Sequence, residues 1–247
     1  LFRSVTVIIY VRPQDDWVES RYKHSVLSGN NLSLSGLQKP FFCDYKRWID
    51  HWSNLIGHDN IVIRSYDNQH LLGRNLAIDF LTTIGARAPQ DYAKSMIRVN
   101  ESLGNAQHEI KKVANTLGIK GRTADRLNQV LISHSCGFRT VRDGARLLSN
   151  SDRTSLRKDY SLANQDIVRD YWDNTSLDLF SPLVPSTIEP WDAKTDLSVS
   201  RASEIFEFIR LNSPEVIREM KYRVGHLPLD NRNPATHMIC AALEESN

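Results

Sequence analysis

The most regular hydrophobic pattern in the chain lies near its beginning. Residues 5–11 form a nearly continuous run of β-branched side chains, Val5, Val7, Ile8, Ile9 and Val11. Such a run is typical of a strand that is buried on both faces of a parallel sheet. Pro13 follows, and it suits the first turn of a helix, where a missing N–H leaves no hydrogen bond unmade. The pattern therefore predicts a strand that turns directly into a helix.

Hydrophobic periodicity also predicts the later elements. A second short buried strand is expected over residues 60–66. Apolar side chains at helical spacing predict helices over residues 42–56, 76–84, 106–117, 123–133, 151–172, 202–210, 214–222 and 234–245. We expect the longest of these to start with an N-cap at Ser151. Strands that alternate with helices indicate an α/β fold with a parallel sheet.

The predicted helix 42–56 carries two tryptophans, Trp48 and Trp52. Their rings could stack on the rings of a sugar. They recur at helical spacing with Tyr45, Ile49 and Ile56, which favours a place in the hydrophobic core instead.

The end of the first strand has the chemistry of a phosphate site. Arg12 stands at its carboxyl end, and the planar guanidinium group can contact a phosphate with two hydrogen bonds. Ligands of open α/β sheets bind beyond the carboxyl ends of the strands, and a helix N-terminus attracts anions. Ser20 follows two turns into the helix, with Lys23 and His24 on a neighbouring face.

Two acidic residues in the first turn of this helix favour a different role for the arginine. Asp15 and Asp16 would stabilise the helix dipole, but they would repel an anion placed on the helix axis. An ion pair between Arg12 and one of them is the structural alternative to a phosphate site.

The segment VTVIIYVRPQDDWVESRYKHSV at residues 5–26 resembles the 3′-phosphate-binding segment of sulfotransferases that use 3′-phosphoadenosine 5′-phosphosulfate (PAPS). In that family the arginine at the strand end and the helical serine hold the 3′-phosphate of the nucleotide. The resemblance implies that Arg12 and Ser20 have this role here, and that Lys23 and His24 assist.

The resemblance continues over residues 5–103. The second predicted strand, NIVIRSY, and the segment RVNESL at residues 98–103 are similar to elements of bacterial sulfotransferases associated with surface polysaccharides. By this resemblance Arg98 and Asn100 join the nucleotide-binding residues. Arg64, at the end of the second strand, could face the nucleotide, although a structural ion pair is the preferred interpretation.

The resemblance implies a P-loop NTPase-like parallel sheet flanked by helices, incomplete at its N-terminus and with a helix-rich C-terminal half. Residues 1–180 would form the sulfotransferase-like domain, and residues 181–247 would form a linker and a helical extension. The implied reaction transfers a sulfuryl group from PAPS to a hydroxyl of a glycan or glycolipid, without a metal. Its nucleotide product is 3′-phosphoadenosine 5′-phosphate (PAP).

The family's glycine-rich loop for the 5′-phosphosulfate, roughly P-K-T/S-G-T-T/S, has no counterpart in the sequence. GNAQHEIKK near Gly104 and GIKGRT near Gly118 are predicted to be helix and turn. The catalytic base is therefore unassigned, and the chain is expected to be a fragment of a longer enzyme. A non-catalytic nucleotide- or glycan-binding relative and a fragment of a P-loop kinase or NTPase are the alternatives.

The composition is that of an ordinary globular protein, with 40% apolar and 24% charged residues among 247. A net charge of +2 excludes a strong general binder of polyanions, and no nucleic-acid partner is expected. Basic residues are concentrated between 105 and 160. A basic surface or a solvated helix face would contain Lys111, Lys112, Lys120, Arg122, Arg126, Arg139, Arg142 and Arg146. The last three are at helical spacing and could reach a phosphate.

The apolar runs, the cysteines, the histidines and the prolines each bear on the expected location and partners of the protein. No apolar run is long enough to span a membrane. The cysteines Cys43, Cys136 and Cys240 lack metal-site spacing, which favours a reduced cytoplasmic location. His226 and His237 are isolated, so no metal site is expected. Prolines indicate a linker over residues 180–194, and the helices beyond it would serve packing or oligomerisation.

Overall fold

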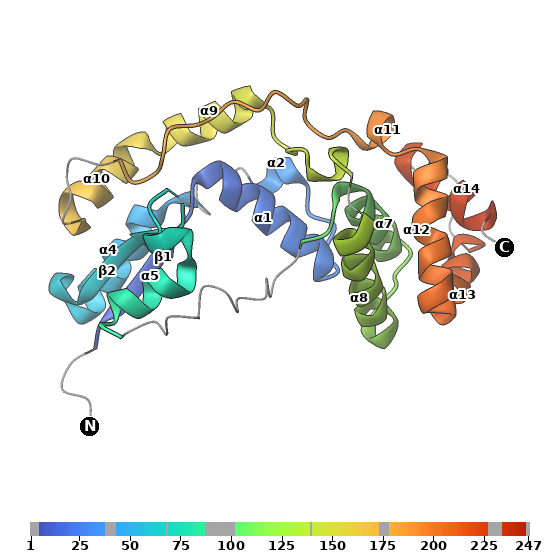
Figure 1. The fold of residues 1–247 in the computed structure, drawn as a ribbon, viewed down its shortest axis with the longest axis horizontal. Helices are drawn as coiled ribbons and strands as arrows, with labels where there is room; N and C mark the ends of the chain where they lie inside the picture. The colour runs from blue at the N-terminus through green and yellow to red at the C-terminus, as the bar shows by residue number, and fades with distance from the viewer. Residues whose placement is uncertain are drawn as a thin grey trace. The chain divides into compact units, whose positions relative to one another are not determined.

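The computed structural model describes residues 5–37, 43–67, 69–86, 102–138, 140–172, 178–226 and 234–245 (Figure 1). The chain forms two compact units, each built from three segments. Unit 1 consists of Leu1–Val18, Ser35–Arg98 and Asn150–Pro185, and unit 2 of Glu19–Leu34, Val99–Ser149 and Ser186–Asn247. This division differs from the two contiguous parts, 1–180 and 181–247, that the sequence led us to expect. One boundary, after Pro185, falls within the predicted linker.

Unit 1 contains a small parallel sheet of two strands, so the fold is a helix-rich mixture of α and β elements. β1 (Val7–Val11) pairs with β2 (Ile61–Ser65) in a register that runs from Val7↔Ile61 to Val11↔Ser65. The Tyr66 amide continues the ladder by donating to the Val11 carbonyl at 2.6 Å. Both strands were predicted. In the described residues the sheet has only these two strands.

One face of this sheet carries the hydrophobic core of unit 1. Val11, Ile61 and Ile63 are buried there with Ile49, Ile167, Leu179 and Phe180. The side chains of a strand alternate between faces, so only every second residue reaches this core. Residues Val7 to Tyr10 of β1 are half-buried, and the prediction that the first strand is covered on both faces was wrong.

The helix over the core face is α4 (Tyr45–Ile56), which begins after the N-cap Asp44. Ile49 is fully buried, whereas Trp48 is 49% and Trp52 43% exposed. The prediction that both tryptophans lie in the core was wrong. Adjacent helical residues differ in direction by about 100°, so a helix that directs Ile49 at a narrow sheet turns Trp48 and Trp52 away from it.

The predicted long helix 151–172 is two helices. α9 (Asn150–Asp159) and α10 (Ser161–Tyr171) are separated at Tyr160, whose backbone angles are φ −105° and ψ 6°. Tyr160 is itself buried. Since α9 begins at Asn150, Ser151 lies inside the helix and the predicted N-cap is misplaced.

A buried ion cluster joins the start of α1 (Gln14–Leu27) to α9 within unit 1. The carboxylate of Asp15 is fully buried and accepts hydrogen bonds from Nε of Arg153 at 2.9 Å and from Nε of Arg157 at 2.7 Å. The arginines also donate to the carbonyls of Val184 and Ser181. A buried carboxylate needs such partners, because removal from water is costly unless the charge is paired and hydrogen-bonded.

Unit 2 is helical in its described residues. Its main helices are α7 (Asn105–Thr116), α8 (Gly121–Phe138), α12 (Val199–Asn212), α13 (Pro214–Val224) and α14 (Pro234–Glu245). Side chains from all five share one hydrophobic core, so the C-terminal helices are part of this unit. The remaining elements are α2 (Leu34–Leu37), α5 (Leu76–Thr83), α11 (Ala193–Asp196), η1 (His58–Asn60), η2 (Leu72–Arg74) and η3 (Arg142–Gly144).

Helix α7 is unusual because most of its polar side chains are buried. As predicted, GNAQHEIKK forms a helix and GIKGRT contains a turn, at Gly118, before α8 begins at Gly121. Lys111 is fully buried, and its Nζ donates to Oδ1 of Asn115 at 2.7 Å. Burial lowers the pKa of Lys111. This lysine therefore cannot belong to the basic surface that the sequence suggested.

Two of the three arginines considered for phosphate binding have structural partners. Arg142 pairs with Asp196 and lies in the short turn η3, not in a helix that continues to Arg146. Arg146 lies 3.5 Å from Glu19. Arg139 is outside the described residues.

None of the described helices is long and apolar enough to cross a membrane.

We expect the Asp15 cluster to be essential for the stability of unit 1. Asp15→Ala leaves Arg153 buried without its carboxylate, and it should lower the free energy of unfolding by about 3–5 kcal/mol. Urea denaturation measures this difference. The control Asp178→Ala removes an exposed carboxylate and should change stability by no more than about 0.5 kcal/mol. Equal effects of the two variants would contradict the role assigned to the cluster.

A second prediction concerns His108 in unit 2. Burial lowers the pKa of His108 to about 3, and the nearby charges of Lys23 and Lys112 act in the same direction. The folded protein then binds fewer protons than the unfolded chain between pH 6.5 and about 3, so stability should fall as the pH falls through this range. His108→Leu should reduce the slope of the free energy of unfolding against pH by about 1.4 kcal/mol per pH unit. Urea denaturation at several pH values tests this, with exposed His226→Leu as control; parallel slopes for wild type and His108→Leu would refute it.

Candidate functional site

The candidate site lies in unit 1, at the edge of the sheet where the two parallel strands end. Arg12 follows β1 directly, and Tyr66 follows β2. The guanidinium carbon of Arg12 lies 4.9 Å from the centre of the Tyr66 ring, and Tyr66 is 37% exposed. Such a cation–π contact holds the guanidinium in place without using its N–H donors. The contact with Tyr66 therefore leaves these donors for other hydrogen bonds.

The structure does not form the ion pair that was the alternative role for Arg12. Asp15 is bound by Arg153 and Arg157, and among the described residues the Arg12 guanidinium takes part in no ion pair. The two arginines also offset the charge of Asp15. The first turn of α1 is therefore less repulsive to an anion than its sequence suggests.

The other predicted nucleotide-binding residues either belong to unit 2 or lie outside the described residues. Ser20 and His24 are exposed on α1 and Lys23 is half-buried, and all three belong to unit 2. Nε2 of His24 lies 3.5 Å from Oγ of Ser28. Arg98 and Asn100 are outside the described residues. Within unit 1, Arg12 is thus the one predicted residue that the described structure places at the sheet edge.

Arg64 has the structural role that was preferred for it. Its Nε donates to Oδ1 of Asp79 at 2.9 Å, and its Nη2 pairs with Oδ2 of this fully buried carboxylate. Tyr10, the register partner of Arg64, donates to Asp79 at 2.6 Å. Burial and this hydrogen bond raise the pKa of Tyr10 to about 12. Burial alone would raise the pKa of Asp79, but its three donors, Arg64, Leu72 N–H and Tyr10, outweigh burial and lower it.

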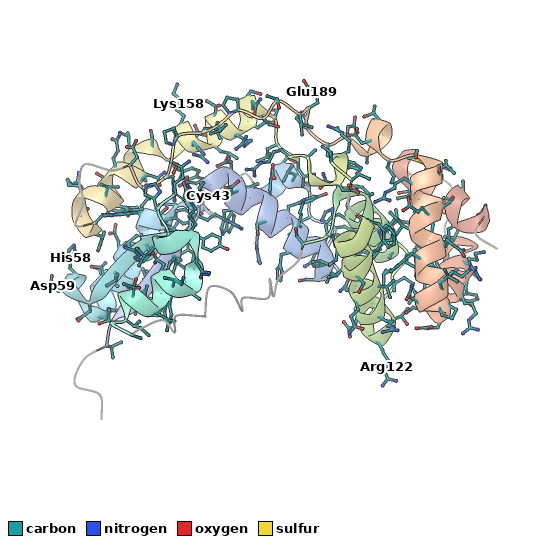
Figure 2. All side chains as sticks on the ribbon, viewed as in Figure 1. Cys43, His58, Asp59, Arg122, Lys158 and Glu189 are labelled. Carbon is teal, nitrogen blue, oxygen red and sulfur yellow. The ribbon has the colours of Figure 1, made fainter. Side chains whose placement is uncertain are left out.

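A cleft along the outer edge of β2 was missed by the sequence analysis. Its volume is about 1020 Å³, and it is lined by residues 61–64 of β2, by part of α5, by the end of α10 and by two histidines. His58 stacks on Tyr171 with a centroid distance of 4.6 Å, and His70 meets Trp172 edge-on at 6.0 Å. Figure 2 labels His58 and the neighbouring Asp59, which lie in η1, the turn after α4. The sequence signal was weak, because it consists of single aromatic and histidine residues far apart in the chain.

A second hollow of about 730 Å³ lies between α9, α10 and the segment 178–183. Its lining includes Arg157 and the exposed Lys158, which Figure 2 labels. Arg157 is already bound to Asp15 and to the Ser181 carbonyl. Within the described residues no group of three or more His, Cys, Asp or Glu side chains could hold a metal ion.

Comparison with known proteins gives little functional information. No protein-family model matches the chain, and no solved structure matches it significantly. An uncharacterized protein of the archaeon Archaeoglobus fulgidus is 28% identical over 129 residues. The match covers 47% of this chain and 36% of that protein. The matched part thus spans about a third of the relative's length.

Substitution of Arg64 and of Arg12 should lower the stability of the protein by different amounts. Arg64→Ala leaves Asp79 buried without its main partner and should lower the free energy of unfolding by about 3–5 kcal/mol. Arg12→Ala removes only a contact with the Tyr66 ring and should lower it by no more than about 1 kcal/mol. Urea denaturation of both variants measures this. A large loss in Arg12→Ala would mean that Arg12 is structural and not available to a ligand.

Proposed function

We propose that the chain is the nucleotide-binding part of a PAPS-dependent sulfotransferase, and that Arg12 binds the 3′-phosphate of PAPS. The observation that supports the proposal is the position of Arg12 and the contacts that it makes. It stands between the end of a parallel strand and the start of a helix, rests on the Tyr66 ring, and forms no ion pair among the described residues. A sulfotransferase-type P-loop fold, larger than the two strands described, and a cytoplasmic location are parts of this proposal.

Physical chemistry supports a phosphate at this place. Backbone N–H groups in the first turn of a helix have no intrahelical partners and carry partial positive charge. A guanidinium group beside them adds a full charge and donors that match phosphate geometry. By the family resemblance alone, Ser20, Lys23, His24, Arg98 and Asn100 are further nucleotide-binding residues of the proposal.

The proposed chemistry uses this phosphate as a remote anchor. Binding energy at the 3′-phosphate positions the sulfuryl group for in-line attack by an acceptor hydroxyl, which we propose belongs to a glycan or glycolipid. The S–O bond to the 5′-phosphate breaks, PAP leaves, and the hydroxyl proton passes to a base. We assign neither this base nor the groups that hold the sulfuryl oxygens to a described residue.

Calorimetric titration with PAP tests the proposal, and 5′-AMP is the matched ligand that lacks the 3′-phosphate. Wild type should bind PAP more tightly than 5′-AMP. A charge-assisted contact contributes about 1.5–3 kcal/mol, so Arg12→Ala should weaken PAP binding by roughly 10- to 150-fold. Binding of 5′-AMP should change little.

Arg122→Ala is the control variant, because this arginine is exposed at the start of α8 (Figure 2). It should bind PAP as wild type does. If wild type bound PAP and 5′-AMP equally, or if Arg12→Ala kept full affinity for PAP, the proposed phosphate site would be refuted.

A further inference from the structure

The cleft along β2 has the features of a ligand site, and all of its lining residues belong to unit 1. Its volume of about 1020 Å³ exceeds the 730 Å³ of the second hollow. Pockets for small ligands usually occupy about 300–1000 Å³ and combine apolar walls with a few placed polar groups. The cleft is therefore large enough for several linked rings.

One end of the cleft is aromatic. Tyr171 and Trp172 end α10 and line the cleft together with His58 and His70. The hydroxyl of Tyr171 donates to Asp50 at 3.0 Å, and Nε2 of His58 lies 2.7 Å from the Asp170 carbonyl. These contacts fix both rings. His58 is exposed, whereas Tyr171 and Trp172 are half-buried, and His58 already covers one face of Tyr171. Held in this way, the three rings offer apolar surface to a ligand at low entropic cost.

The charges in the cleft largely cancel. Arg64 is paired with Asp79, and Arg169 is paired with Asp170. Asp59 remains as an exposed carboxylate beside His58. A cleft without surplus positive charge is poorly suited to a nucleotide or another polyanion. It suits an uncharged ligand that can form many hydrogen bonds.

The floor of the cleft offers backbone groups for such bonds. In a parallel ladder alternate residues of a strand face the neighbouring strand. Because the Tyr66 amide bonds to Val11, the even-numbered residues of β2 face β1, and the N–H and C=O of Ile63 point to the cleft side. No strand covers this edge in the described residues.

A buried side-chain nitrogen adds a further hydrogen-bonding group to the cleft. Nδ1 of His70 is buried and has no hydrogen-bond partner among the described residues. Oδ2 of Asp67 is 3.8 Å from this nitrogen, too far for a hydrogen bond. Asp67 is itself fixed by the amides of Gln69 and Ser181. Thr82 and Thr83 on α5 also line the cleft.

We propose that this cleft binds a neutral oligosaccharide, whose rings pack on the aromatic cluster of His58, Tyr171 and Trp172 and whose hydroxyls bond to the polar groups of the floor and walls. The interpretation of the cleft as the acceptor site of a sulfotransferase rests on the proposed function. The interpretation of the cleft as a glycan-binding site rests on the geometry of unit 1 alone.

The experiment uses a printed array of bacterial surface glycans and three variants of the full chain. Thr82→Trp introduces an indole ring into the lining of the cleft from an exposed position on α5, and Thr154→Trp does the same in the second hollow from an exposed position on α9. The two are matched, because each threonine hydroxyl bonds to the carbonyl four residues earlier at 2.8 Å. The double variant Trp48→Ala/Trp52→Ala removes the exposed tryptophans of α4.

Wild type should bind neutral glycans on the array. Calorimetry with the best of them should show at least a tenfold loss of affinity in Thr82→Trp and no change in Thr154→Trp or in the α4 variant. Urea denaturation should confirm that all variants are folded. Absence of glycan binding by wild type, binding restricted to anionic glycans, or full affinity in Thr82→Trp would each overturn the inference.

Titration of Thr82→Trp with PAP separates this inference from the proposed function. Thr82→Trp should bind PAP as wild type does. A wild type that binds PAP but no glycan would retain the nucleotide site and refute the cleft. A wild type that binds neutral glycans in the cleft but shows no preference for PAP over 5′-AMP would refute the nucleotide site and retain the cleft.

Discussion

The buried carboxylate of Asp15 is the interaction on which unit 1 depends most directly. It fixes the first turn of α1 to two arginines of α9, and those arginines also bind carbonyls of the segment that follows α10. Three parts of the chain are thereby joined behind the end of β1. Because Asp15 is occupied in this way, Arg12 is left to rest on Tyr66 at the sheet edge. The availability of one arginine thus follows from the pairing of a neighbouring carboxylate.

The sequence predicted well those features that depend on neighbouring residues. Both strands, the helical nature of GNAQHEIKK and the turn at Gly118 follow from local periodicity and glycine conformations, and the structure contains them. The structural role of Arg64 was also anticipated. Its partner Asp79 is only 15 residues away, on the helix that follows the strand. The PAPS-binding role of Arg12 and Ser20 stays a prediction.

Features that depend on distant partners could not be predicted. Asp15 and Arg153 are 138 residues apart, and no local pattern indicates that they meet. The stripe of α4 that faces the sheet was misjudged, because periodicity identifies an amphipathic helix but not how much of its apolar face a two-stranded sheet can cover. Lys111 is chemically a surface residue, and only the surrounding helices of unit 2 determine its burial. The cleft along β2 is likewise a property of the assembled unit.

The open side of β2 also bears on self-association. A strand edge with free backbone groups can pair with a strand of another molecule, and proteins usually protect such edges against aggregation. Here side chains of α5 and of the end of α10 line the cleft along this edge, so access is limited to what enters the cleft. The same walls would then select a ligand and keep copies of the protein apart. Substitutions that remove wall side chains would be expected to reduce solubility at high concentration, even where folding is unaffected.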